Sequence, residues 1–293
     1  MKQGAVECGG EGQQPVETLP SASKRLDIRR IYPALIFAPL FYVLVRYLPP
    51  SAFFSLVLTA SLLATGEFYR LHFRTEQGAV PIVAGVGATA LLLTSMQWPD
   101  LLSEQTVLLL TVVGSLLLPL FSQRDLSRAL MDSAVLAFGV LYVGFTIGHL
   151  LRTRALDGGE FLVFFVVLTT WAGDTGAYYV GTLFGRRKLT PTISPNKTVE
   201  GLIGGVACSV LTAFGARAWF LPSLTTVDCV ALGLLMAGVG LAGDLVESAL
   251  KRSAGVKDSG GLLPGHGGML DRLDSLLFTA PAFYYYVTLG KGY

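Results

Sequence analysis

One stretch of the sequence decides what kind of fold to expect. Residues 226–250 read TVDCVALGLLMAGVGLAGDLVESAL. About 20 mainly apolar residues in a helix cross the core of a bilayer, and this stretch is long and apolar enough to do so. Towards its end Asp244, Glu247, Ser248 and Lys251 recur at intervals that put them on one helical face. Ionisable groups at the end of a membrane helix are costly unless they face a partner or a wet cavity, so this polar stripe indicates a site.

The rest of the chain repeats the apolar pattern. The sequence is 52% hydrophobic and only 14% charged, whereas soluble domains carry roughly 25% charged residues. A net charge of +2 is too small to indicate a nucleic-acid partner. The composition predicts an all-α integral membrane protein, a polytopic bundle of about nine transmembrane helices. The predicted spans are residues 31–48, 51–69, 79–97, 106–121, 131–151, 160–184, 200–221, 226–250 and 271–289.

We expect one membrane domain with a short tail. Residues 1–27 are polar and contain no apolar run, which predicts a disordered cytoplasmic tail and not a signal peptide. Residues 28–155 are expected to form the N-terminal transmembrane helices, and residues 156–293 the catalytic transmembrane region.

Basic residues predict the orientation, because lysine and arginine in short loops favour the cytoplasmic side. With the N-terminus inside, the basic residues fall mainly in the inside loops. They are Arg70, Arg74, Arg124, Arg128, Arg186, Arg187, Lys188, Lys197, Lys251, Arg252 and Lys257. We therefore expect the N-terminus and residues 248–274 to lie on the cytoplasmic side of a bacterial-type inner membrane.

A glycine-rich loop follows the polar stripe. Residues 253–268 contain six glycines, and Lys251, Arg252, Lys257 and His266 lie within or beside them. Glycine allows a close approach of the backbone to a ligand, and exposed N–H groups beside compact cations suit a polyphosphate. The alternative is a solvated flexible loop whose cations only set the topology. The loop lacks the G-x-x-x-x-G-K-[ST] pattern and is not a P-loop.

Carboxylates begin the last predicted span. Asp271 and Asp274 are three residues apart and share a helical face. They could cap that helix, but with Asp244 they also supply the oxygen ligands that Mg²⁺ prefers when phosphates complete its shell.

A second group of polar residues surrounds the predicted spans 160–184 and 200–221. Asp174 lies deep in an apolar segment, and an intramembrane aspartate is a functional candidate unless a neighbouring side chain satisfies it. The loop that follows contains Ser194, Asn196 and Lys197, a denser polar mixture than orientation alone requires. We expect these side chains to contact the substrate.

The pattern S-x₂-K-R-x₄-K-D-x-G-x₂-L-P-x-H-G-G-M-x-D-R-L-D over residues 248–274 resembles the signature of the phosphatidate cytidylyltransferases (CDP-diacylglycerol synthases). Residues 171–185 and 194–201 also resemble that family. The resemblance extends over about residues 160–289, whereas the N-terminal half matches only as a run of membrane helices.

The resemblance implies an enzyme that makes CDP-diacylglycerol and pyrophosphate from CTP and phosphatidic acid, for phospholipid synthesis. It implies an all-helical membrane bundle, in at least one case a homodimer, and Mg²⁺, with room for a second metal or a monovalent cation. Asp244, Asp271 and Asp274 become the expected metal ligands. The resemblance implies catalytic roles for Asp244, Asp271, Asp274, Lys251 and His266. The residues expected to contact the substrate are Asp174, Ser194, Asn196, Lys197, Arg252, Lys257 and Arg272.

Three rival functions fit parts of the pattern. A CDP-alcohol phosphotransferase would carry a compact D-x-x-D-G…G-x-x-x-D-x-x-x-D motif, which the sequence lacks. A CTP-dependent lipid kinase resembles this family only in part. An ion-coupled transporter could use Asp174, Asp244 and Asp271 as an ion path, but it would need carboxylates open to both sides, and the sequence crowds its cations and glycines at one face. The sequence also shows no internal repeat of the kind common in transporters.

Overall fold

The structure is a computed structural model, and it describes residues 31–47, 49–73, 79–121, 126–260 and 267–291. The predicted tail 1–27 and His266 lie outside the described residues. Most of the described chain is helical. In chain order the helices are α1 (Ile31–Tyr47), α2 (Pro50–His72), α3 (Ala79–Gln97), α4 (Glu104–Leu117), η3 (Leu118–Phe121), η4 (Leu126–Arg128), α5 (Ala129–Gly139), η5 (Val140–Phe145), α6 (Thr146–Ala155), α7 (Gly159–Phe184), α8 (Val199–Trp219), α9 (Thr226–Ser253) and α10 (Leu270–Lys291).

Every predicted span coincides with helix, but the count of nine membrane-crossing helices is not confirmed. Within the described residues, seven helical stretches are long and apolar enough to cross a membrane. Helix α1 has 17 described residues and is not one of the seven. Helix α10 is not one of the seven, and its first turns contain Asp271, Arg272 and Asp274. The chain is an integral membrane protein, and the acidic residues of α10 lie in its first turns.

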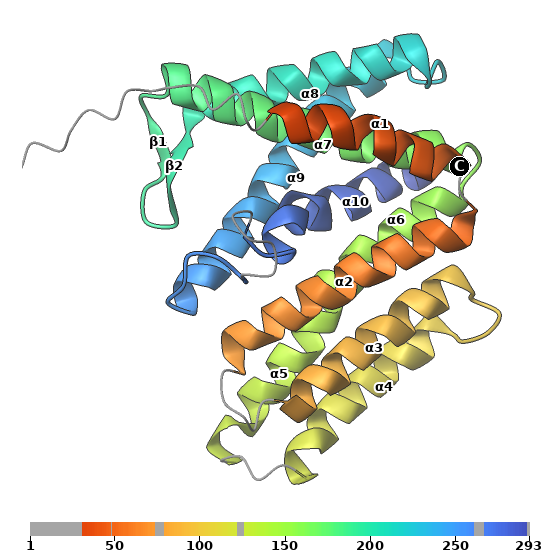
Figure 1. Ribbon diagram of the computed structural model, residues 1–293, viewed down its shortest axis with the longest axis vertical. Coiled ribbons are helices and arrows are strands. Elements are labelled where there is room, and N and C mark those ends of the chain that lie inside the picture. Colours follow the sequence, from red (N-terminus) through yellow and green to blue (C-terminus); the bar gives the residue numbers. More distant parts are fainter. Residues whose placement is uncertain (1–30, 48, 74–78, 122–125, 261–266, 292–293) are drawn as a thin grey trace, which may run out of the picture.

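The helices form two groups that meet at α10 (Figure 1). In one group α7 packs against α8, and α9 packs against both α8 and α10. In the other, α2 and α3 pack together with α5 and α6, and α10 also contacts α6 and α2. The buried rings of Phe165 on α7 and Phe283 on α10 are 5.3 Å apart in this core. Helix α10 therefore connects the C-terminal helices to the N-terminal ones.

A β-hairpin interrupts the helical pattern between α7 and α8. The sequence predicted a loop there, whereas the structure pairs β1 (Lys188–Thr190) with β2 (Ser194–Thr198) in antiparallel register. The Oγ1 of Thr198 accepts a hydrogen bond from the Gly201 N–H at 3.1 Å and so caps α8. The Glu200 carboxylate accepts from the backbone N–H groups of Arg186 and Arg187 at 3.0 and 3.2 Å. These bonds fix the base of the hairpin against the start of α8.

The fifth predicted span contains a π-helical turn. Between α5 and α6, residues Val140–Phe145 form η5, which widens an otherwise continuous helical stretch from Leu126 to Ala155. Such turns are rare and occur frequently at functional sites. This one contains Tyr142.

Helices α9 and α10 cross in near contact at Gly243. A Cβ atom at this position would lie 2.5 Å from the backbone oxygen of Asp274, far closer than real Cβ contacts. The absence of a side chain at Gly243 therefore lets α10 approach α9 where Asp244 and Asp274 occur.

The close crossing generates a prediction about stability. Gly243→Ala should lower the free energy of unfolding by about 1–3 kcal/mol, because the added methyl forces the two backbones apart. Gly238→Ala on the same helix is the matched control, since a Cβ there meets no described atom within 4 Å. That control should keep or raise stability, because alanine is the better helix former. Thermal unfolding of both variants in one detergent checks this, and equal melting temperatures would contradict the close crossing.

Candidate functional site

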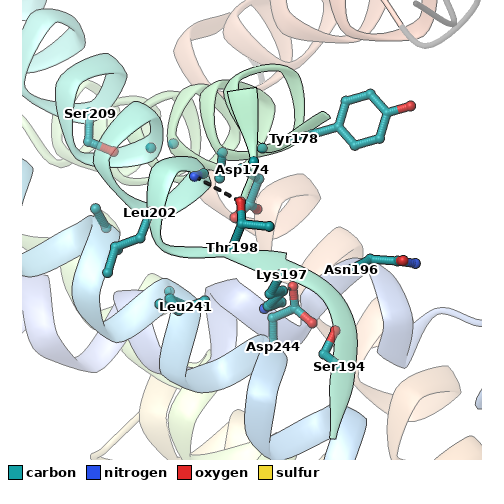
Figure 2. Close-up of a pocket in the computed structure, with 18 of the residues that line it drawn as sticks. Asp174, Tyr178, Ser194, Asn196, Lys197, Thr198, Leu202, Ser209, Leu241 and Asp244 are labelled. Atoms are coloured by element: carbon teal, nitrogen blue, oxygen red, sulfur yellow. Dashed lines mark hydrogen bonds and ion pairs between the residues drawn. The ribbon is translucent and has the colours of Figure 1, made fainter. Parts of the chain in front are cut away.

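A pocket of about 520 Å³ lies between α7, α8, α9 and the β-hairpin. Its lining includes five of the predicted site residues, Asp174, Ser194, Asn196, Lys197 and Asp244. They come from α7, β2 and α9, which are far apart in the sequence. Figure 2 shows Lys197 and Asp244 meeting beneath β2, while the Asn196 side chain points away from Leu202 and Leu241. The fold therefore gathers both groups of polar residues that the sequence singled out.

The Lys197–Asp244 ion pair connects the hairpin to α9. The Lys197 Nζ lies 2.5 Å from Oδ2 of Asp244, and the two side chains are 18% and 34% exposed. The Ser248 hydroxyl donates to the other oxygen of Asp244 at 3.4 Å. A partly shielded pair of this kind leaves a cation and a carboxylate facing the same pocket, where an anionic ligand can reach the lysine.

Two further carboxylates lie beside Asp244. The Ser275 hydroxyl donates to Oδ1 of Asp174 at 3.3 Å, and the Ser275 N–H donates to Oδ1 of Asp274 at 2.7 Å. Asp174, Asp244 and Asp274 are within electrostatic range of one another. Carboxylates from α7, α9 and α10 thus crowd together, and like charges in a weakly hydrated site require cations nearby.

Lys251 occupies a neighbouring position between two other carboxylates. Its Nζ lies 2.5 Å from Oε2 of Glu247 and 2.6 Å from Oδ1 of Asp271. Glu247 is 1% exposed, so its charge depends on this contact. The sequence analysis put Glu247 on the polar stripe of α9 but assigned it no role. In the structure Glu247 and Asp271 both contact the ammonium group of Lys251.

The other oxygen of Asp271 organises the chain before α10. Oδ2 accepts hydrogen bonds from the Gly268 N–H at 2.8 Å and from the Ser259 N–H and hydroxyl at 3.1 and 3.0 Å. Asp271 thus has a capping function as well as an ion pair. The structure places Asp271 in this network with Lys251 and places Asp274, one turn later, beside Asp244.

Glu67 of α2 completes this network, and sequence reasoning missed it. This carboxylate is 4% exposed. Its Oε2 accepts from the Leu270 N–H at 2.9 Å and lies 3.1 Å from the Ser259 hydroxyl. A Cβ at Gly268 would lie 2.4 Å from that oxygen, so a side chain there would displace the Glu67 carboxylate. The sequence does contain a signal for Glu67. It lies inside an apolar predicted span, and an ionisable residue within a membrane helix is a candidate functional residue.

The remaining predicted residues lie at the edge of the site. Arg252, Lys257 and Arg272 are exposed to solvent, and Arg252 donates to the Val256 carbonyl at 3.3 Å. His266 lies outside the described residues. Arg252, Lys257 and Arg272 do not line the pocket.

The donor set suits a hard cation that takes few protein ligands. Over the described ranges, no three histidine, cysteine or acidic side chains are close enough to hold a metal ion by themselves. The pocket nevertheless presents the carboxylates of Asp174 and Asp244, and Mg²⁺ is commonly bound by one or two carboxylates with water and substrate phosphates. The residues therefore fit Mg²⁺ that binds together with a phosphate ligand.

Comparison with known proteins identifies the family. The model of the cytidylyltransferase family matches residues 28–289. This chain belongs to the cytidylyltransferase family. A phosphatidate cytidylyltransferase of Staphylococcus saprophyticus is 43% identical over 159 residues, which are 52% of this chain and 57% of that protein. The phosphatidate cytidylyltransferase of Bacillus subtilis is 41% identical over 155 residues, 53% of this chain and 58% of that protein.

A third relative has no assigned activity. The uncharacterized protein YnbB of Escherichia coli is 42% identical over 168 residues, which are 56% of each chain. The matches thus cover about half the length of the curated relatives. The family expected from residues 248–274 is confirmed.

The Glu67 contacts generate a prediction about the loop network. Glu67→Gln should weaken the hydrogen bonds that residue 67 accepts from Leu270 and Ser259, because a neutral amide oxygen accepts less strongly than a carboxylate. We expect faster amide hydrogen exchange in peptides covering Ser259 and Gly268–Leu270, and a lower melting temperature. Glu104→Gln is the control, because Glu104 pairs with Arg152 outside this network. Unchanged exchange at Leu270 in Glu67→Gln would contradict the role of Glu67.

Proposed function

We propose that this protein transfers the cytidylyl group of CTP to phosphatidic acid, giving CDP-diacylglycerol and pyrophosphate. The observation that carries the proposal is the Lys197–Asp244 pair in the pocket. It sets a phosphate-binding cation beside the carboxylates of Asp174 and Asp274 in a member of the cytidylyltransferase family. Relatives named phosphatidate cytidylyltransferase support the choice of lipid substrate.

The reaction needs alignment and charge neutralisation more than proton transfer. A phosphate monoester has a second pKa near 6, so the lipid phosphate is largely ionised at neutral pH. It can attack the α-phosphorus of CTP directly while the bond to pyrophosphate breaks, without a general base. Two anions must be brought together, and the protein's lysines offset their repulsion. Lys197 is placed to orient phosphate oxygens in the pocket, and Lys251 is held for the same purpose by Glu247 and Asp271.

Mg²⁺ is part of the proposal. Asp244 would hold it, with Asp274 and Asp271 of α10 as the other predicted ligands and Asp174 close by. When bound, the ion would neutralise the phosphates and stabilise the departing pyrophosphate. Ser194, Asn196, Arg252, Lys257, Arg272 and His266 stay predictions for substrate contacts, and a second ion and a homodimer stay predictions too.

We also propose a cytoplasmic site in a bacterial-type inner membrane. CTP is soluble and phosphatidic acid is held in the bilayer, so the pocket must be reached from both. A site at one end of the apolar helices α7, α8 and α9 satisfies this need. The basic residues of the hairpin and of the end of α9 favour the cytoplasmic side.

The activity can be tested directly. Purified protein with labelled CTP, phosphatidic acid and Mg²⁺ should form labelled CDP-diacylglycerol and pyrophosphate, and removal of Mg²⁺ with a chelator should stop product formation. A known synthase in the same detergent serves as the positive control. If that control is active and the protein forms no product, the proposed reaction is wrong.

Substitution of the aspartates separates metal binding from loop organisation. Asp244→Asn, Asp271→Asn and Asp274→Asn should each lower turnover by about 100-fold or more, because each removes charge from the site. Asp271→Asn should also lower the melting temperature, since its carboxylate holds Ser259, Gly268 and Lys251. Near-normal turnover in any of the three variants would remove that residue from the proposed centre.

A further inference from the structure

The pocket is lined by a second lysine as well as Lys197. Lys188 of β1 and Lys197 of β2 are the two cations that the described residues contribute to the lining. The Lys197 ammonium group is paired with the Asp244 carboxylate at 2.5 Å. Lys188 is exposed to solvent and has no ion pair within the described part of the chain. It therefore presents to the pocket a positive charge that no described carboxylate offsets.

The structure separates Lys188 from the two arginines that precede it. In the sequence, Arg186, Arg187 and Lys188 form one basic run that predicts orientation in the membrane. All three residues are exposed, but only Lys188 is part of the pocket lining. A cation that serves orientation alone needs only to lie on the correct side of the membrane. The position of Lys188 at a polar pocket therefore calls for a further explanation.

The backbone at Lys188 is fixed without help from its side chain. The Arg187 carbonyl accepts a hydrogen bond from the Val199 N–H at 2.9 Å, and Lys188 lies opposite Thr198 in the hairpin register. Thr198 caps α8 through its own hydroxyl. Since none of these contacts uses the lysine ammonium group, this group is available for a ligand, and its removal should leave the hairpin intact.

The pocket extends from the hairpin into the membrane helices. Lys188 belongs to residues 185–198, which lie between the apolar spans of α7 and α8, and the hairpin leaves the bundle at the ends of these helices (Figure 1). Ser209 and Met236 line the pocket from the middle of α8 and α9. Charge is costly inside an apolar span, so a ligand with several negative charges is best accommodated at the hairpin end.

We propose that the Lys188 ammonium group binds the β- and γ-phosphates of CTP, the part of the nucleotide that departs as pyrophosphate. This inference rests on the proposed function, which brings the α-phosphorus of CTP to Asp244 and Lys197. From there the remaining phosphates extend towards the hairpin end, where Lys188 lies. As the lipid phosphate oxygen bonds to the α-phosphorus, the bond to the β-phosphate oxygen breaks and negative charge moves onto pyrophosphate. Lys188 stabilises that charge as a fixed cation.

The test compares Lys188→Gln with Arg186→Gln, two substitutions that each remove one exposed positive charge from the same loop. Arg186 does not line the pocket, and it contacts Glu200 through its backbone N–H. Binding of CTP and of CMP, each with Mg²⁺, and of phosphatidic acid alone is measured by the shift in melting temperature across a concentration series. These measurements need no turnover, so they report on Lys188 even if the proposed reaction fails.

Lys188→Gln should weaken CTP binding by about 10-fold and leave the binding of CMP and of phosphatidic acid unchanged, because CMP lacks the two phosphates that Lys188 contacts. Its melting temperature without ligand should equal that of the wild type. Lys188→Arg should retain most of the affinity for CTP, since it keeps the charge. Arg186→Gln should bind all three ligands as the wild type does.

The inference is overturned if Lys188→Gln binds CTP with wild-type affinity, if it loses affinity for CMP or phosphatidic acid to the same extent, or if Arg186→Gln weakens CTP binding equally. A failure of the proposed reaction gives a different result. In that case the protein binds CTP, and Lys188→Gln weakens this binding, but the wild type forms no CDP-diacylglycerol.

Discussion

The crowding of carboxylates at the ends of apolar helices is the constraint on which the rest of the structure depends. Asp174, Asp244 and Asp274 come from three helices and share one small region, and Glu247 and Asp271 add two more charges nearby. Burial of unpaired charge costs several kcal/mol per ion, so this arrangement needs cations that the fold must supply. The β-hairpin supplies Lys197, and α9 itself supplies Lys251. The hairpin, the α9–α10 crossing and the loop network all serve to keep these charges close and compensated.

The N-terminal helices take part in this arrangement. The Glu67 carboxylate of α2 accepts a hydrogen bond from the Leu270 N–H at the start of α10, so the two groups of helices are joined at the loop network. A site built only from residues 156–293 would lack the Glu67 carboxylate, so the N-terminal helices contribute a hydrogen-bond acceptor to the loop network.

The sequence predicted the helical architecture and five polar residues of the pocket, but not which side chains contact one another. Apolar length identified the spans, and intramembrane charge identified Asp174 and Asp244, because both signals are local. The hairpin was missed because its base is fixed by the Glu200 carboxylate, which accepts a hydrogen bond from the Arg186 N–H 14 positions earlier, and this contact forms only once the chain has folded back. The three-residue spacing predicted that Asp271 and Asp274 share a helical face. In the structure they have different partners, because Asp271 binds the loop before α10 whereas Asp274 interacts electrostatically with Asp244. Glu67 could not be assigned, since helix packing alone brings it to Ser259 and Leu270, which are 192 and 203 positions away.

The most direct test of this account is the position of the bound ion and nucleotide. A structure of the protein with CTP and Mn²⁺ in place of Mg²⁺, located by its anomalous scattering, would show both. The account predicts an ion bonded to the Asp244 carboxylate, at about 2.0–2.2 Å, and shared with the phosphates of CTP and a carboxylate of α10. Lys197 should then contact a phosphate oxygen. An ion and nucleotide bound elsewhere, with the Lys197–Asp244 pair unchanged and the pocket without ligand, would contradict it.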